Sequence, residues 1–204
     1  MLKLKIFIVL LFTSLGTLLH GQATATATKQ ADLQVGVTFS FANPDYAQDL
    51  YNLAQPTNGQ DRWHGSGVYA DLDLRYHLGI EFDFHQLSGP DKVLYERTYQ
   101  IGGRYSHPIH DRFVPYGKVL VGRGVFNFAA VDATAGQSTQ IANLACNIQT
   151  IGGGLDVRVL PGLNVRAFDY EYQHWNNFPP NKLNPQVISI GIAYRFHGRN
   201  RYKQ

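Results

Sequence analysis

The segment YADLDLRYHLGIEFDFHQ, residues 69–86, alternates polar and apolar side chains with few interruptions. Successive side chains of a β-strand point to opposite faces, so the segment predicts two strands with Leu72 and Phe82 on one face and Asp71 and Asp83 on the other. Residues 77–79 would form the tight turn between them. A soluble sheet would bury the apolar face in a core, whereas a membrane-spanning barrel would expose it to lipid.

The composition of the whole chain is that of an all-β protein. Its 204 residues are enough for one domain, and they include 20 glycines, 12 tyrosines and 12 phenylalanines with 16% charged residues. An even number of strands of about 9–11 residues fits a closed membrane barrel. We therefore predict an eight-stranded antiparallel up-and-down transmembrane β-barrel. Its strands are expected at 32–41, 67–76, 80–87, 93–106, 112–128, 148–159, 163–175 and 186–196.

The N-terminus has the features of an export signal. Lys3 and Lys5 precede an apolar run, and the small residues Gly21 and Ala23 suit cleavage after residue 23. An uncleaved N-terminal membrane helix is the alternative. The predicted organisation is a cleaved signal peptide (1–23), a short N-terminal segment (24–31), the barrel (32–196) and a basic C-terminal tail (197–204).

The mature chain carries little net charge. Loss of the two N-terminal lysines would lower the net charge from +3 to +1, which gives no reason to expect a nucleic-acid partner. The single cysteine, Cys146, excludes an intramolecular disulfide. Stability must therefore come from the sheet itself.

The connections between the predicted strands alternate in length. Short turns at 77–79, 107–111 and 160–162 would lie at one end of the barrel, and the longer connections at the other. Outer-membrane barrels place short turns in the periplasm and long loops at the cell surface. The two longest loops, 42–66 and 129–147, are candidates for binding a surface ligand.

The polar face predicts a charged interior. If Tyr76 lies near Ile80 across the turn, Arg75 is opposite Glu81, Asp73 opposite Asp83, and Asp71 opposite His85. The interior of an eight-stranded barrel is just wide enough to be filled by side chains, so these charges would leave no pore of porin size. A soluble lipocalin-like carrier, with the faces inverted, is the alternative. The predicted lumen network comprises Asp71, Asp73, Arg75, Glu81, Asp83, His85, Arg104, Lys118, Asp156, Arg158 and Arg166.

Aromatic residues near the strand ends suggest two membrane-interface belts. Strict alternation also puts Arg123 and Asp169 on the lipid face, where a bulge or a position near the loop rim would be needed to accommodate them. The predicted interface residues are Trp63 and Trp175 at the long-loop end, and Tyr76, Tyr105 and Phe113 at the short-turn end.

The segment PQVISIGIAYRF, residues 185–196, looks like the C-terminal strand signal that the barrel-assembly machinery recognises, with Ile188, Ile190, Ile192, Tyr194 and Phe196 at every second position. Together with QIGGRYSH (100–107), VPYGKVLVGRG (114–124) and IGGGLDVRV (151–159), it resembles the small bacterial outer-membrane β-barrel domain family, relatives of the OmpA and OmpX type. The resemblance implies a location in the outer membrane of a Gram-negative-type bacterium, contact with lipid and lipopolysaccharide, and delivery to the assembly machinery.

We predict no catalytic residue, metal site or cofactor. The histidines are dispersed, and the turn with His107, His110 and Asp111 lacks a third defined ligand. YEYQHWNN (170–177) resembles the active strand of lipid A deacylase barrels, but Asn176 replaces the nucleophilic serine beside His174. The predicted protein is a non-enzymatic outer-membrane barrel with a structural or surface-interaction role. A narrow channel for small solutes and a lipid A-modifying enzyme are the alternatives.

Overall fold

The structure is a computed structural model that describes residues 31–43, 63–74, 77–89, 95–110, 112–131, 139–178 and 183–196, with backbone alone for 128–131 and 139–142. The predicted signal peptide (1–23), the predicted tail (197–204) and all but the last residue of the segment 24–31 lie outside these ranges. Arg75 and Tyr76 also lie outside them.

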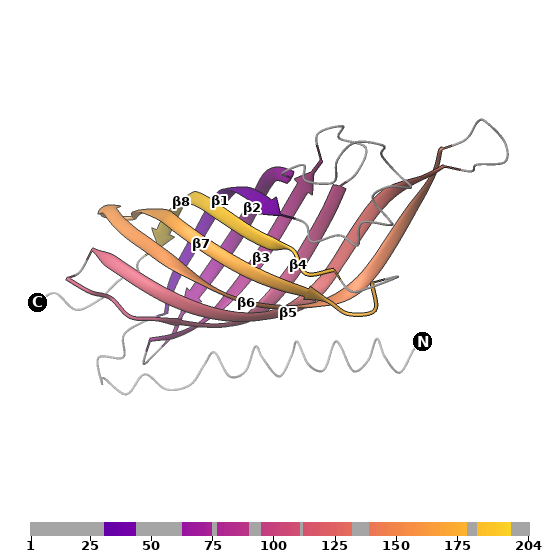
Figure 1. The fold of residues 1–204 in the computed structure, drawn as a ribbon. Helices are drawn as coiled ribbons and strands as arrows, with labels where there is room; N and C mark the ends of the chain where they lie inside the picture. The colour runs from indigo at the N-terminus through magenta and orange to yellow at the C-terminus, as the bar shows by residue number, and fades with distance from the viewer. Residues whose placement is uncertain are drawn as a thin grey trace, which may run out of the picture.

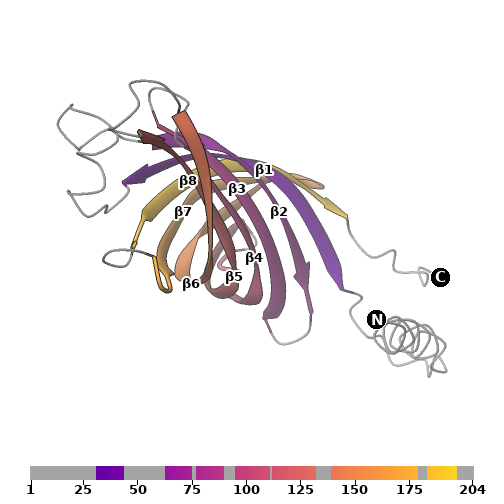
Figure 2. The ribbon, with the colours of Figure 1, turned by 90° about the vertical axis from the view of Figure 1, so that its right-hand side faces the viewer.

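Eight antiparallel strands form a closed barrel in which each strand pairs with the next and β8 pairs with β1 (Figures 1 and 2). The prediction of an all-β, eight-stranded up-and-down barrel is confirmed. The strands are β1 Asp32–Asn43, β2 Trp63–Asp73, β3 Leu78–Ser88, β4 Tyr95–Ser106, β5 Phe113–Val131, β6 Thr139–Leu160, β7 Leu163–Trp175 and β8 Gln186–Phe196.

The wall of the barrel is apolar outside and polar inside. Val37 is 54% exposed and Ile151 62% exposed on the outer face, whereas the neighbouring inward residues Thr38 and Thr150 are buried. This arrangement contradicts the inverted, lipocalin-like alternative. Closure of the sheet lets the backbone amides of the wall pair with neighbouring strands instead of water, and the outer band is apolar, as a lipid environment requires. The described residues contain no helix with the length and apolar character needed to cross a membrane.

The predicted register between β2 and β3 is wrong. Asp71 pairs with Glu81, and Asp73 with Gly79, so Asp71 is not opposite His85, nor Asp73 opposite Asp83. The turn starts earlier than predicted, with Leu74 N donating to Leu78 O at 2.8 Å. The error is an even number of residues, and a shift by an even number keeps every side chain on its face.

Several strand boundaries also differ from the prediction. β2 begins at Trp63 rather than residue 67, because the glycine- and serine-rich stretch after Trp63 continues to pair with β1. β5 and β6 continue to the pair Val131–Thr139 and extend beyond the other strands (Figure 1). Most of the predicted loop 129–147 is therefore a β-hairpin, while residues 44–62 of the other predicted loop lie outside the described ranges.

A bulge in β7 resolves the position of Asp169. Arg166 pairs with Gly191 and Asp169 with Ser189, so two residues of β7, Ala167 and Phe168, are opposite one position of β8. Both are exposed outside, and the alternation resumes with Asp169 completely buried inside. Arg123 remains on the outer face, opposite Asn147 in the loop-side part of β5.

Tight turns connect consecutive strands at the other end of the barrel. His77, between β2 and β3, has φ 67°, and Gly162, between β6 and β7, has φ 85°. The left-handed region is accessible to glycine without steric cost, which suits Gly162 to its turn. The short turns and the long hairpin thus lie at opposite ends, and we refer to these as the turn end and the loop end.

Candidate functional site

The turn-side half of the lumen contains an ion-pair network built on Arg104 of β4 and Arg166 of β7. Arg104 Nη2 lies 2.6 Å from Asp156 Oδ2, and Arg104 Nη1 contacts Asp71 Oδ2. Arg166 Nη2 is 2.9 Å from the same Asp71 oxygen, and Arg166 Nε is 3.2 Å from Asp156 Oδ1. All four side chains are buried. Shared pairing of this kind is needed because an unpaired charge in a low-dielectric interior costs several kcal/mol.

Neutral side chains complete this layer. The guanidinium of Arg166 lies 3.5 Å from the centre of the Tyr69 ring, and that of Arg104 lies 4.0 Å from the centre of the Tyr116 ring. Such cation–π contacts strengthen when water is excluded. Gln34 Nε2 donates to carboxylate oxygens of the network at 3.2 and 3.3 Å. Side chains therefore span the lumen at this level.

Lys118 of β5 is the centre of the next layer. Its ammonium nitrogen lies 2.8 Å from Glu81 Oε1, 2.7 Å from Asp169 Oδ2 and 2.7 Å from Glu171 Oε1. The three N–H groups of an ammonium can each serve one of these carboxylates. These contacts join β5 to β3 and β7, which are its second neighbours on either side of the barrel.

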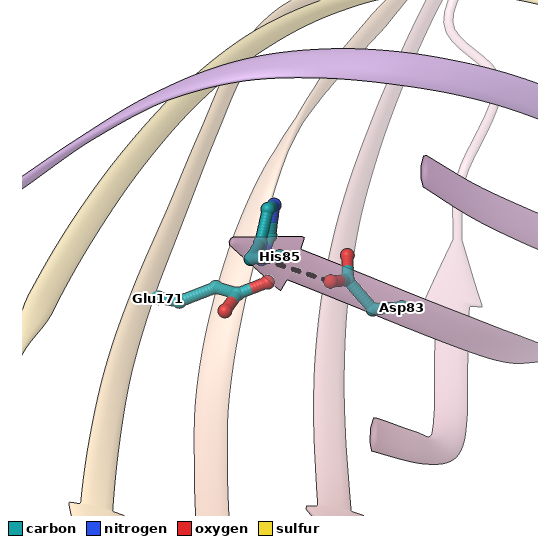
Figure 3. A group of neighbouring side chains, drawn as sticks. All are labelled: Asp83, His85 and Glu171. Carbon is teal, nitrogen blue, oxygen red and sulfur yellow. Dashed lines mark ion pairs between the residues drawn. The ribbon is translucent and has the colours of Figure 1, made fainter. Parts of the chain in front are cut away.

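A second acidic group lies beside this layer, toward the loop end. Figure 3 shows Asp83 and His85 on β3 and Glu171 on β7 pointing toward one another, with His85 Nδ1 2.9 Å from Asp83 Oδ1. The other ring nitrogen of His85, Nε2, is 3.3 Å from the hydroxyl of Thr38. One ligand atom from each of the three residues lies within 4.8 Å of the others, so they have the composition and spacing of a metal-binding group.

An apolar cluster fills the loop end of the lumen. Phe126 stacks on Trp63 with the ring centres 5.6 Å apart, and Phe178 packs edge-on against both Phe126 and Trp175. The two tryptophans are at most 1% exposed. The loop-end cluster comprises Ala42, Trp63, Leu87, Phe126, Cys146, Ile148, Trp175, Phe178, Leu183 and Val187.

The prediction that Trp63 and Trp175 belong to an interface belt is therefore wrong. Both residues do lie at strand ends, but both side chains face the lumen, in the same alternation as Asp71 on β2 and Glu171 on β7. Tyr105 and Phe113 are about half exposed on the outer face near the turn end.

The sequence matches the family described as outer membrane protein beta-barrel domain over residues 10–196. The chain belongs to this family. An outer-membrane barrel is consistent with the apolar outer band and the charged lumen described above.

Three solved structures share the fold of this outer-membrane barrel at low sequence identity. Neisserial surface protein A is 11% identical, with a TM-score of 0.60 over 80% of this chain and 97% of its own. Ail, the attachment invasion locus protein of Yersinia pestis, is 14% identical in its complex with the heparin analogue sucrose octasulfate, with a TM-score of 0.53 over 82% and 99%. The N-terminal barrel of Pseudomonas aeruginosa OprF is 10% identical, with a TM-score of 0.51 over 83% and 100%. No curated protein matches the chain.

Most of the residues predicted for the lumen of this barrel do face it. The two layers and the acidic group bring together Asp71, Glu81, Asp83, His85, Arg104, Lys118, Asp156 and Arg166. Asp73 is at the turn-end rim, 3.7 Å from Arg195 Nη2. Arg158 is half-buried at the same rim and lines a hollow of about 240 Å³ with Arg112 and Arg195.

Several lumen residues were missed by the sequence analysis. Asp169 and Glu171 were hidden by the bulge, which reverses the alternation within β7. Glu96 could have been found, because it alternates with Thr98, Gln100 and Arg104 in the predicted strand 93–106. The ion pair between Arg195 and Asp32, 2.7 Å apart, was missed because it forms only when β8 closes the barrel against β1.

The residues of the predicted assembly signal form the outer face of β8. Ile188, Ile190, Ile192, Tyr194 and Phe196 are each 45–55% exposed, and Tyr194 packs edge-on against Phe196 with the ring centres 4.8 Å apart. β8 is the strand that closes the barrel against β1.

Proposed function

We propose that this outer-membrane barrel is a non-catalytic scaffold with a sealed lumen, which holds its loop-end segments at the cell surface for binding. The observation that supports this proposal is the filling of the lumen at two levels. Arg166 and Glu81 are completely buried in the ion-pair layers, and Trp175 and Leu87 are completely buried in the loop-end cluster.

The narrow channel is the weaker alternative. A conducting path through this lumen would have to break contacts such as Lys118–Asp169 and Arg104–Asp156, at 2.7 and 2.6 Å. It would also have to displace the packed rings of Trp63 and Phe126. Breaking buried charge contacts is costly, because each freed group stays in a low-dielectric environment.

The enzyme alternative has little support in the geometry around His174. Its Nδ1 lies 2.6 Å from Asn184 Oδ1, so its neighbour is an amide rather than a nucleophile. Acyl-ester hydrolysis by a histidine requires an activated hydroxyl within hydrogen-bonding distance.

The β5–β6 hairpin is the part of the described chain that extends furthest at the loop end. It continues past Asn127, the last residue of β5 that pairs with β4, to the pair Val131–Thr139. Two similar structures are of a surface protein and of an attachment protein that was solved with a heparin analogue. These observations support a role in contact with another surface or a polyanionic glycan.

The same proposal includes the route and the partners of the protein. Export would use residues 1–23, folding would use the outer face of β8 as the signal to the assembly machinery, and the apolar band would contact lipid and lipopolysaccharide. The observation behind the signal is the row of outward apolar residues that ends in Phe196.

Planar-bilayer recording of the purified barrel tests whether the lumen is sealed. We expect no discrete conductance steps from the folded protein, with gel mobility before and after boiling as the check on folding. Regular single-channel steps would support the channel and overturn the sealed-lumen proposal.

A binding assay tests the role of the hairpin. Because Val131 and Thr139 are a pair, residues 132–138 can be replaced by Asn-Gly, which favours a two-residue hairpin turn. We expect cells that present this variant to bind host-cell surfaces or immobilised heparin less than cells with the original hairpin at equal surface amounts. Equal binding would remove the hairpin from the proposal.

A further inference from the structure

Carboxylates outnumber permanent cations in the buried lumen of the described chain. The buried carboxylates are Asp71, Glu81, Asp83, Glu96, Asp156, Asp169 and Glu171, and the Arg and Lys side chains among them are Arg104, Lys118 and Arg166. Arg195 is also buried, but it is at the rim with Asp32 and Asp73. Several negative charges in a dry interior must be neutralised, either by protons or by a bound cation.

The uncompensated charge is concentrated toward the loop end. Arg104 and Arg166 contact Asp71 and Asp156, and Lys118 contacts Glu81, Asp169 and Glu171. Glu96 is in no ion pair within the described part of the chain, and Asp83 makes only the longest of the Lys118 contacts. Asp83 is 3.9 Å from the Lys118 ammonium and next to the neutralisable imidazole of His85.

Glu96 is a buried carboxylate next to this acidic group, without a partner among the described residues. It is completely buried, and neither carboxylate oxygen has a hydrogen-bond partner within the described part of the chain. It lies on the inner face of β4, opposite Leu87 and one inward position above Thr98, which is opposite His85. A buried, unpartnered carboxylate beside an imidazole indicates a missing positive partner.

The contact between His85 and Asp83 indicates a missing cation at the same place in the lumen. His85 Nδ1 and Asp83 Oδ1 are 2.9 Å apart, yet neither atom has a partner in hydrogen-bond geometry. Adjacent ligand atoms around a divalent ion at about 2.0–2.2 Å are separated by roughly 3 Å. The hydroxyl of Thr38 at His85 Nε2 orients the ring, as an outer partner commonly does for a metal-bound histidine.

We propose that Asp83, His85 and Glu171 bind one divalent transition-metal ion inside the lumen, with Glu96 as a nearby buried carboxylate whose charge the ion would help to neutralise. An imidazole with carboxylates suits Zn²⁺ or Mn²⁺. Glu171 can join the site while its Oε1 accepts from Lys118, because each carboxylate oxygen has two lone pairs. The overlapping group formed by Glu81, Asp83, Asp169 and Glu171 does not need a second ion, because the Lys118 ammonium contacts all four.

The position of the site predicts how the ion enters. The loop-end cluster covers it on one side and the ion-pair layers on the other, so the ion is captured as the barrel closes and exchanges slowly afterwards. Metal must therefore be present during folding.

The test is to fold the unfolded, metal-free protein into detergent with Zn²⁺ or, separately, Mn²⁺, then to remove free metal and measure bound metal by mass spectrometry. We expect one ion per folded chain, retained during brief exposure to EDTA. His85→Gln should lower the bound metal by more than about tenfold. His64→Gln is the matched control, since His64 is exposed on the outer face of β2.

Gel mobility without boiling shows whether each variant has folded, and binding is expressed per folded chain. The proposal is overturned if the original protein folds in the presence of Zn²⁺ and of Mn²⁺ but retains neither metal, which would mean that protons neutralise the carboxylates. It is equally overturned if folded His85→Gln retains as much metal as folded His64→Gln.

Discussion

Gly124 on β5 lies directly against the indole of Trp175 on β7: a Cβ atom at position 124 would be 2.3 Å from the Cη2 atom of Trp175. The two strands are not neighbours in the sheet, since β6 lies between them. Because Gly124 has no side chain, the indole of Trp175, from two strands away on the same inner face, can fill the loop end of the lumen.

Gly124→Val should therefore displace Trp175. We expect tryptophan fluorescence to shift to longer wavelength and the folded band on unboiled gels to weaken, with a loss of about 1–3 kcal/mol in the free energy of unfolding. Gly103→Val is the control, because a Cβ there meets nothing within 4 Å. Equal effects of the two substitutions would contradict the packing described for the loop-end cluster.

Lys118→Leu should destabilise the barrel severely. The change leaves Glu81, Asp169 and Glu171 without their shared cation, and removing one partner of a buried ionic group costs about 3–5 kcal/mol. Urea-induced unfolding in detergent or lipid vesicles measures the effect. Arg123→Leu, which removes an outward-facing cation from the same strand, should change the free energy of unfolding by no more than about 0.5 kcal/mol. Similar unfolding curves for both variants would mean that Lys118 does not neutralise this layer.

Val37→Arg should reveal the lipid-facing side of the wall. Val37 is in the middle of β1, where an arginine in the bilayer midplane costs about 2–4 kcal/mol. Leu33→Arg, near the turn end of the same strand, should cost no more than about 1 kcal/mol. The two variants are compared by unfolding from lipid vesicles, and an equal cost at both positions would argue against this depth assignment.

Phe196→Ala should reduce assembly in cells more than stability in vitro. If the outer face of β8 is the assembly signal, the amount of heat-modifiable protein in the outer-membrane fraction should fall several-fold, while the purified variant still folds into detergent. Phe82→Ala is the control, since Phe82 is similarly exposed on β3. Equal losses in cells would indicate that the phenylalanine contributes only lipid contact.

Sequence patterns were sufficient for the architecture because period-2 alternation is a property of single strands. Asp71, Glu81 and Asp83 could be assigned to the lumen from their own strands, without knowing their partners. The pairing of Asp71 with Glu81 could not be predicted in the same way, because it depends on where the chain turns between Leu74 and Leu78.

The candidate site was harder to predict, because it depends on contacts across the lumen. Nothing in the local sequence links His85 with Glu171, which come together when β3 and β7 face each other in the closed barrel. Trp63 and Trp175 were assigned to the wrong face because an aromatic residue at a strand end is common in both environments. Their packing on Phe126 and Phe178 is a tertiary feature.

The bulge at Ala167 and Phe168 makes the number of residues in β7 more important than their identity at this point. Inward side chains have even numbers before it, at Asn164 and Arg166, and odd numbers after it, from Asp169 to Trp175. A substitution at either outward position would leave the lumen unchanged. Loss of one of the two residues would instead turn two carboxylates, an amide and a tryptophan toward lipid, so the contents of the lumen depend on the number of residues at the bulge and not on which outward side chains stand there.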